Sequence, residues 1–148
     1  MARRRPAFLD ANVVMYAIGQ DHPYKRPCVA VLKQIEAETI RVVSSVEILQ
    51  EILHRYYSLR NYTAAATAFA STKTLCDKIL PVLEADVDRA HRLLQDLPHL
   101  GVRDAIHAAT ILNNGLRAII STDKHFDQIK ELRRIDPAKL ARRRVSWT

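Results

Sequence analysis

Short apolar runs alternate with longer segments of helical periodicity along almost the whole chain, and this alternation limits the folds open to it. Strand-like runs are expected at residues 7–9, 40–43, 79–83, 118–120 and 132–135. Strands that alternate with helices build α/β structures whose sheet is mostly parallel. We therefore predict an α/β fold, a three-layer sandwich in which helices flank a mostly parallel sheet of about five strands.

The intervals between these runs carry helix-forming patterns. Helices are predicted, in chain order, at about residues 12–18, 23–37, 44–58, 62–75, 86–97 and 103–114, with a short helical turn at 126–129. Pro81 favours an edge position or a strand end for its run, because proline cannot donate to a sheet ladder. Gly115 follows the last long helix directly, which is the usual place for a C-terminal glycine.

The helix that begins near Ser44 carries its large apolar side chains on one arc. These are Val46, Leu49, Leu53, Tyr56 and Tyr57. We interpret the tyrosines as core or dimer-interface residues. Ser44-x-x-Glu47 matches a capping box, in which the glutamate hydrogen-bonds back to the helix start. We therefore assign Glu47 a structural role, which leaves Glu51 as the glutamate available for chemistry.

Composition excludes several classes of protein. The three glycines lie far apart, so no P-loop or dinucleotide-binding turn is present. Cys28 and Cys76 are too few for a zinc cluster, and we expect reduced thiols in a cytoplasmic protein. No apolar run approaches the roughly 20 residues that span a membrane, so we predict no membrane partner. We expect one domain at residues 1–137 and a basic C-terminal arm at 138–148.

The net charge of +7 comes from 23 basic and 16 acidic residues, and it indicates a polyanionic partner such as RNA. Most of the excess lies at the two ends of the chain. Six arginines form two runs: Arg3, Arg4, Arg5, Arg142, Arg143 and Arg144. Without them the chain is nearly neutral. Terminal charge runs are usually solvated, but we also consider that these arginines hold RNA phosphates.

Several carboxylates occupy positions where α/β proteins place their functional groups. Asp10 follows the first strand, Asp123 comes shortly after the fourth, and functional groups gather at the carboxyl ends of parallel strands. Asp104 lies in the first turn of its helix, on the apolar face, and should point towards the sheet. Glu51 flanks the apolar arc of its own helix, and Asp127 lies one helical turn beyond Asp123.

Each of these acids also has a purely structural interpretation. Asp10 is suited to cap the helix that follows it, and Asp104 to complement a helix dipole. Asp123 and Asp127 would then be solvated turn residues. Position alone leaves the structural and functional interpretations equally open.

A cluster of these acids would need a cation. Each close pair of carboxylates costs on the order of 3 kcal/mol at an effective dielectric constant of 20, unless a cation or protonation neutralises the charge. Oxygen ligands suit Mg²⁺ or Mn²⁺ better than Zn²⁺, and the six histidines show no zinc-ligand spacing. A water made more acidic by such an ion can attack a phosphodiester.

Four segments resemble, in order, the motifs of PIN-domain nucleases. Residues 8–13 (FLDANV) resemble the opening Asp-x-Asn motif, and residues 50–53 (QEIL) look like the family's conserved glutamate. Residues 103–109 (RDAIHAA) are similar to the Asp-Ala-x-x-Ala-Ala segment, and residues 120–127 (ISTDKHFD) to the late Thr/Ser-x-Asp-x-x-Phe motif. Their order and spacing fit the family over residues 7–137.

The size of the chain most resembles VapC-type toxins of prokaryotic toxin–antitoxin pairs. The resemblance implies a Mg²⁺- or Mn²⁺-dependent endoribonuclease that cleaves RNA phosphodiesters with a metal-activated water. It also implies a homodimer and a small antitoxin that blocks the groove. A housekeeping RNA-processing nuclease and a non-catalytic RNA-binding module on the same fold are the alternatives.

The resemblance also implies roles for individual residues. The catalytic acids would be Asp10, Glu51, Asp104 and Asp123, of which Asp10, Asp104 and Asp123 would bind the metal. Asn12 and Ser121 would be supporting residues that orient acids or waters. Asp127 would be a further supporting acid, and it remains an alternative to Asp123. His107 lies three residues after Asp104, so it could touch the site, but we favour a packing or solvent-facing role for it.

Overall fold

The structure is a computed structural model that describes residues 5–142, and it confirms the predicted α/β fold. Its five strands form one sheet: β1 (Ala7–Leu9), β2 (Val42–Ser45), β3 (Ile79–Leu80), β4 (Ala118–Ile120) and β5 (Arg133–Ile135). The strand order is β3-β2-β1-β4-β5, and every neighbouring pair is parallel. Pro81 follows β3, which lies at an edge of the sheet as predicted.

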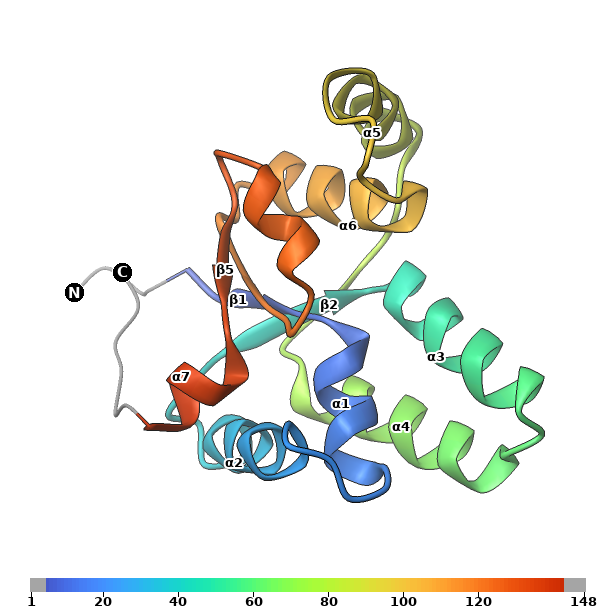
Figure 1. Ribbon diagram of the computed structural model, residues 1–148, viewed down its shortest axis with the longest axis vertical. Coiled ribbons are helices and arrows are strands. Elements are labelled where there is room, and N and C mark those ends of the chain that lie inside the picture. Colours follow the sequence, from blue (N-terminus) through green and yellow to red (C-terminus); the bar gives the residue numbers. More distant parts are fainter. Residues whose placement is uncertain (1–4, 143–148) are drawn as a thin grey trace.

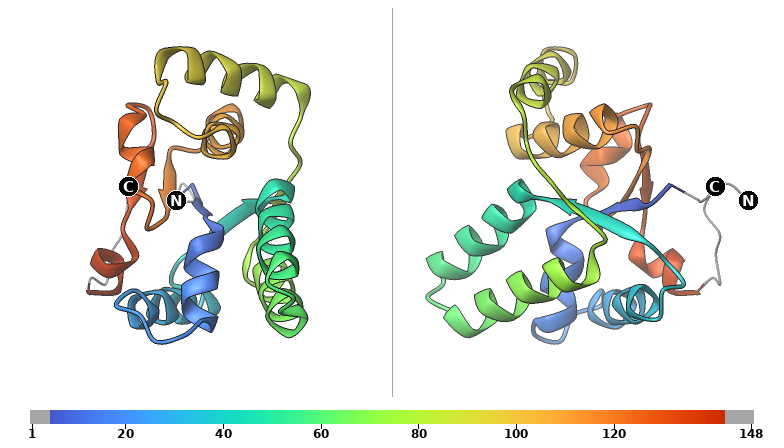
Figure 2. Two further views of the ribbon diagram at one scale, coloured as in Figure 1. Left: turned by 45° about the vertical axis from the view of Figure 1, so that its right-hand side comes forward. Right: turned by 180° about the vertical axis from the view of Figure 1, so that it is seen from behind.

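Helices cover both faces of this sheet. They are α1 (Ala11–Ile18), α2 (Lys25–Glu36), α3 (Val46–Ser58), α4 (Tyr62–Leu75), α5 (Glu84–Asp96), α6 (Val102–Asn113) and α7 (Pro137–Arg142), with a short 3₁₀ helix at Lys124–Gln128. Helices α5 and α6 pack together above the strands in Figure 1, and α1, α2, α4 and α7 lie below them. Figure 2 shows the same layers from two further directions.

The central strand is buried at every residue. Ala7, Phe8 and Leu9 are fully inaccessible to solvent, because β1 has a neighbour on each side and helices on both faces. Cys28 and Cys76 are free, buried thiols. Among the helices of residues 5–142, none is long and apolar enough to cross a membrane.

Strand β2 lies two residues later than the apolar pattern predicts. Ser44 and Ser45 belong to the strand and pair with Ile79 and Leu80 of β3. The buried Ser44 hydroxyl donates to the carbonyl of Leu9 at 3.0 Å, so its polar group is satisfied inside the sheet. A strand that ends in two small polar residues has no apolar signal at its carboxyl end.

The predicted apolar arc of α3 is confirmed at the buried Tyr56 and the half-buried Leu49 and is wrong at its other residues. The helix buries Ile48, Ile52 and Tyr56, whereas Leu53 and Tyr57 are exposed. The predicted capping box is also wrong, because Ser45 is the N-cap and accepts from the backbone N–H of Ile48 at 3.3 Å. Helix α3 therefore starts at Val46. Its first-turn glutamate, Glu47, forms an ion pair with Arg103 at 3.4 Å instead.

The chain does not become an extended arm at residue 138. Residues 138–142 belong to α7, which packs on α2 and buries Pro137 and Leu140. The remainder of the expected arm, residues 143–148, lies outside the described residues.

Candidate active site

The site lies at the point where the strand order reverses. The chain runs outward from β1 through β2 to β3 and then returns to place β4 on the other side of β1. Such a switch point opens a crevice outside the carboxyl ends of the strands. Asp10 follows β1 directly, and Ser121 follows β4. The fold therefore brings together two segments that are more than 100 residues apart.

Hydrogen bonds hold the Asp10 carboxylate in place. Its Oδ1 accepts from the backbone N–H of Ala11 at 2.8 Å, so Asp10 also caps α1. Its Oδ2 accepts from the Ser121 hydroxyl at 2.6 Å and from the Asn12 amide at 3.1 Å. Asn12 also donates to Ser121 at 3.2 Å. The structure thus places both predicted supporting residues in direct contact with Asp10.

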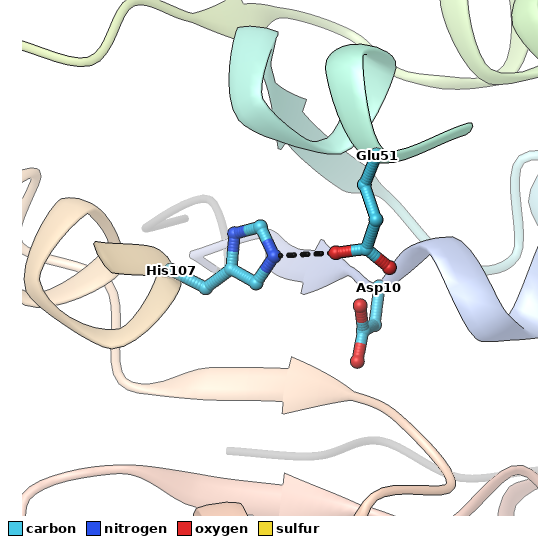
Figure 3. A group of neighbouring side chains, drawn as sticks. All are labelled: Asp10, Glu51 and His107. Carbon is cyan, nitrogen blue, oxygen red and sulfur yellow. Dashed lines mark hydrogen bonds and ion pairs between the residues drawn. The ribbon is translucent and has the colours of Figure 1, made fainter. Parts of the chain in front are cut away.

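Glu51 reaches the same place from α3. Its carboxylate lies beside Asp10 and pairs with His107 of α6, with 3.0 Å between Oε1 and Nε2. Figure 3 shows the three side chains converging from the end of β1, α3 and α6. One ligand atom from each lies within 4.8 Å of the other two, a spacing at which a single metal ion could be held.

A second group of similar size contains the other two predicted acids. Asp104, Asp123 and His125 also offer ligand atoms within 4.8 Å of one another. Asp123 Oδ1 accepts from the backbone N–H of His125 at 2.9 Å and lies 2.7 Å from its Nδ1. The backbone N–H of Asp123 donates to Ser121 at 3.0 Å. Ser121 therefore links the two groups.

The crowded charges shift the acidities of these groups. Burial, and then the charge of Asp123 and a hydrogen bond to it, raise the pKa of Asp104 to about 7. Burial raises the pKa of Asp10 as well, against the opposing influence of His107. Hydrogen bonds from His125 and Asp104 outweigh burial and lower the pKa of Asp123. Asp104 is therefore only partly ionised at neutral pH in the absence of a cation.

Asp127 is engaged elsewhere. Arg134 donates to both of its carboxylate oxygens, at 2.9 Å from Nε and 3.2 Å from Nη2. Arg134 is nearly buried, and it also donates to the carbonyl of Ser121 at 3.1 Å and pairs with Asp136 at 3.5 Å. Asp127 thus anchors an arginine that supports the loop after β4, and it belongs to neither group of potential ligands.

Only Arg5 and Arg142 of the two arginine runs lie among the described residues. Arg5 donates to the carbonyl of Gly115 at 3.0 Å, which places it before β1 and β4, at the end of the sheet opposite to Asp10. Arg142 is the last residue of α7. The other four, Arg3, Arg4, Arg143 and Arg144, lie outside the described residues. The described arginines therefore give no support to an RNA-binding role beside the acids.

Sequence reasoning underrated one residue of the site region and missed another. His107 is buried, as a packing residue would be, and it also contacts Glu51, which is the less favoured of its predicted roles. Its signal was the helical spacing of three from Asp104, which puts both on one face. Arg134 was not singled out, because its contacts with Asp127 and with the carbonyl of Ser121 depend on how the chain turns before β5.

The donor set fits a divalent cation. Asp10, Glu51, Asp104 and Asp123 supply carboxylate oxygens, the ligands that Mg²⁺ and Mn²⁺ prefer. Their charged partners within residues 5–142 are histidines, so no permanent positive charge balances them there. The raised pKa of Asp104 reports the same imbalance. A cation would relieve it.

Comparison with known proteins points to one family. The PIN-domain family model matches residues 7–132. Ribonuclease VapC13 of Mycobacterium tuberculosis is 32% identical over 127 residues, which cover 86% of this chain and 97% of that protein. Ribonuclease VapC23 of the same organism is 35% identical over 116 residues, covering 78% and 91%.

Solved structures share the fold at low sequence identity. The sarcin-ricin-loop-cleaving toxin VapC20 of Mycobacterium tuberculosis superimposes with a TM-score of 0.68 at 17% identity, covering 84% of this chain and 95% of that one. The FitAcB structure from Neisseria gonorrhoeae gives a TM-score of 0.68 at 19% identity, covering 90% and 99%. A toxin–antitoxin complex from Klebsiella pneumoniae gives 0.62 at 18% identity, covering 88% and 97%.

Proposed function

The chain belongs to the PIN-domain family and is similar throughout to its VapC ribonucleases, and from this premise we propose how it acts. It is an endoribonuclease toxin whose Asp10, Glu51, Asp104 and Asp123 form the catalytic centre. Asp10, Asp104 and Asp123 bind Mg²⁺ or Mn²⁺, and the substrate is an RNA phosphodiester.

The observation that supports this function best is the convergence of four acids from four elements at the switch point of the sheet. Asp10, Glu51 and His107 form one group, and Asp104, Asp123 and His125 form the other. Carboxylates gathered without a permanent countercharge destabilise a fold, so such a cluster indicates a cation-binding role.

Asp10 and Asp104 have different tasks in this proposal. Asp10 is held rigid by Ser121, Asn12 and the start of α1, so its carboxylate needs no reorganisation on binding. Asp104 must lose its proton before it becomes a full ligand, because its pKa lies near 7. A bound divalent ion supplies the positive charge that lets the RNA phosphate approach the acids and that makes a water more nucleophilic.

The reaction is a hydrolysis without a covalent enzyme intermediate. A water oxygen forms a bond to phosphorus while the bond to one ester oxygen of the RNA backbone breaks. The acids hold and orient the reacting groups, and no serine, threonine or cysteine nucleophile is required.

Substitution of Asp104 by asparagine tests the assignment. Asp104→Asn should abolish cleavage of a mixed RNA pool in Mg²⁺ or Mn²⁺, with an unchanged circular dichroism spectrum. Asp88→Asn is the matched control, since it removes an equal charge from the exposed surface of α5 and should cleave like the parent. Cleavage by Asp104→Asn at the parent rate contradicts the site. RNA binding without cleavage by the parent would favour a non-catalytic module.

We also propose a small antitoxin as partner. A groove of about 610 Å³ between α1 and the end of α3 is lined by Asn12, Tyr16, Arg55 and Leu59, among others. Because Asn12 contacts Asp10, a segment seated in this groove would end at the catalytic centre. An antitoxin encoded beside this chain should therefore inhibit cleavage when mixed with it in equal amounts. Arg55→Glu should weaken that inhibition without reducing basal cleavage.

The second proposed partner is another copy of the chain. Helix α3 turns Val46, Leu53 and Tyr57 outward, and Tyr57 packs against Tyr62 of α4 with 5.1 Å between ring centroids. Exposed apolar residues that are contiguous on one face are typical of protein–protein contacts. We propose that this face, defined by Val46, Leu53, Tyr57 and Tyr62, forms the homodimer interface.

A further inference from the structure

His107 connects two of the elements that build the site. It extends from α6 towards α3, and its side chain is only 1% exposed. Its Nε2 lies 3.0 Å from Oε1 of Glu51, and this is the hydrogen bond that the Glu51 carboxylate makes among the described residues. Figure 3 shows the ring beside the carboxylate, with Asp10 below both. The position of Glu51 therefore depends on a contact with α6.

The direction of this hydrogen bond follows from chemistry. An ionised carboxylate only accepts, so the hydrogen must lie on Nε2. The Nδ1 atom of His107 is buried and has no hydrogen-bond partner within residues 5–142. Nothing therefore favours the tautomer with its hydrogen on Nδ1. Both the neutral Nε2–H tautomer and the imidazolium carry a hydrogen on Nε2, so His107 donates to Glu51 in either charge state.

Packing holds the imidazole ring in this orientation. His107 lies 5.9 Å from the ring of the fully buried Phe8, centroid to centroid, at an interplanar angle of 42°. Phe8 belongs to β1, two residues before Asp10. The ring is thus fixed by the same strand that carries Asp10 and by the same helix that carries Asp104. A glutamate on α3 is thereby tied to both.

We propose that His107 is a positioning residue, which holds the Glu51 carboxylate against Asp10 in the geometry that binds the catalytic cation. This inference rests on the proposed function, since it concerns the same site. A glutamate side chain has several freely rotating bonds, and ordering it on each binding event opposes binding. In this inference Glu51 joins Asp10, Asp104 and Asp123 as a ligand, because its carboxylate offers an atom within 4.8 Å of one from Asp10. Groups that hydrogen-bond a metal-ligating carboxylate change metal affinity by about 10–100-fold when removed.

Three substitutions at position 107 separate the hydrogen bond from the bulk of the ring. His107→Leu keeps an apolar side chain of similar volume and removes the donor. In His107→Gln, the side-chain amide nitrogen is as many bonds from Cα as Nε2 of histidine, so it can replace the donor to Glu51. In His107→Asn, the amide nitrogen corresponds to Nδ1 and is too close to the backbone to do so. Calorimetric titration of the full chain with Mn²⁺ alone is the readout. We expect about tenfold weaker binding for Leu and Asn, and near-parent binding for Gln.

A double substitution tests whether His107 acts through Glu51. In the Glu51→Ala background, His107→Leu should weaken Mn²⁺ binding no further, because the residue it positions is absent. A further loss in that background would show that His107 is a direct ligand and would overturn the proposal. If His107→Leu does not fold, as thermal unfolding would reveal, the comparison of Gln with Asn decides.

The remaining outcomes are distinguishable from failure of the proposed function. If the parent binds no Mn²⁺, the proposed metal-dependent function fails, and the positioning role fails with it. If the parent binds Mn²⁺ and the Leu, Gln and Asn variants all bind it equally well, only the positioning role is overturned. In cleavage assays, His107→Leu should raise the Mn²⁺ concentration required for half-maximal rate and leave the KM for RNA unchanged.

Discussion

Arg134 holds Asp127 by both carboxylate oxygens, at 2.9 Å and 3.2 Å, and so separates this acid from the catalytic group. The late motif offers two acids, and the sequence favours Asp123 but leaves Asp127 as an alternative. Only Asp123 lies in a group with Asp104. The two positions should therefore respond differently to substitution.

We predict that Asp127→Asn retains cleavage within about threefold of the parent and lowers the free energy of unfolding. The loss should be about 1–2 kcal/mol, because Arg134 is nearly buried whereas Asp127 is half exposed. Asp123→Asn should instead abolish cleavage. Rate measurements and urea unfolding of both variants provide the check, and a dead Asp127→Asn enzyme with parent stability would reverse the assignment.

The raised pKa of Asp104 predicts how the metal-free protein responds to pH. The folded state holds this proton up to a pH of about 7, whereas the unfolded chain releases it near the ordinary value of 3.8. The folded state thus binds more protons between these values, and its stability from this group falls as the pH rises. Asp104→Asn has no titrating carboxyl at this position, so its stability does not fall with rising pH for this reason. Its melting temperature in EDTA should exceed that of the parent at pH 7.5 by about 3–6 °C and should match it near pH 4.

Metal binding should release the proton that Asp104 holds. A cation that takes Asp104 as a ligand must displace the proton held there, so Mn²⁺ affinity should rise between pH 6 and pH 8. The release can be counted by calorimetry in two buffers with different enthalpies of ionisation. Close to one proton should appear at pH 6 and much less at pH 8. An affinity that is flat over this range would remove Asp104 from the metal site.

Sequence reasoning placed the acids well because their positions follow from local rules. Asp10 comes directly after a buried strand and Asp123 three residues after another, and a parallel sheet brings the carboxyl ends of its strands to one edge. Reasoning failed at α3, where Ser45 rather than Ser44 caps the helix. The helix also carries apolar side chains on two neighbouring arcs, and only its packing against the rest of the fold decides that Ile48 and Ile52 are buried whereas Leu53 and Tyr57 are exposed.

Other features depend on tertiary structure that no local pattern reports. The pairing of His107 with Glu51 joins residues 56 positions apart, and it exists because α6 and α3 both pack at the end of β1. Arg134 likewise lies in a strand of mixed polarity and contacts Ser121 only across the sheet. Periodicity can assign a residue to a face, but it cannot say which side chain of another element lies opposite.

The exposed face of α3 predicts the oligomeric state. Tyr57 is 57% exposed, and a charge there would be buried against a second copy if the dimer forms through this face. Tyr57→Glu should weaken self-association at least tenfold, which corresponds to about 1.4 kcal/mol. Analytical ultracentrifugation of the parent and the variant gives the comparison. Glu36→Lys on α2 serves as the control for a changed charge, and equal dissociation of both variants would argue against this interface.

Ser121 is the residue through which the two groups of acids should communicate. Its buried hydroxyl donates to Asp10 at 2.6 Å and accepts from the backbone N–H of Asp123 at 3.0 Å. Ser121→Ala leaves the backbone N–H of Asp123 without its acceptor and leaves Asp10 Oδ2 with the Asn12 amide alone, which should lower the free energy of unfolding by about 1–3 kcal/mol. The hydroxyl also lowers the pKa of Asp10, so its loss favours the protonated carboxyl.

Both effects weaken cation binding. We expect Ser121→Ala to reduce Mn²⁺ affinity by about 10–100-fold, with part of the loss recovered at higher pH as Asp10 ionises. Ser121→Thr keeps the hydroxyl, so it separates the effect of losing the hydrogen bonds from the effect of changing the side-chain volume. Titration of the three proteins with Mn²⁺ at pH 6.5 and pH 8 measures this. Parent affinity in Ser121→Ala at both pH values would show that Asp10 is positioned without Ser121.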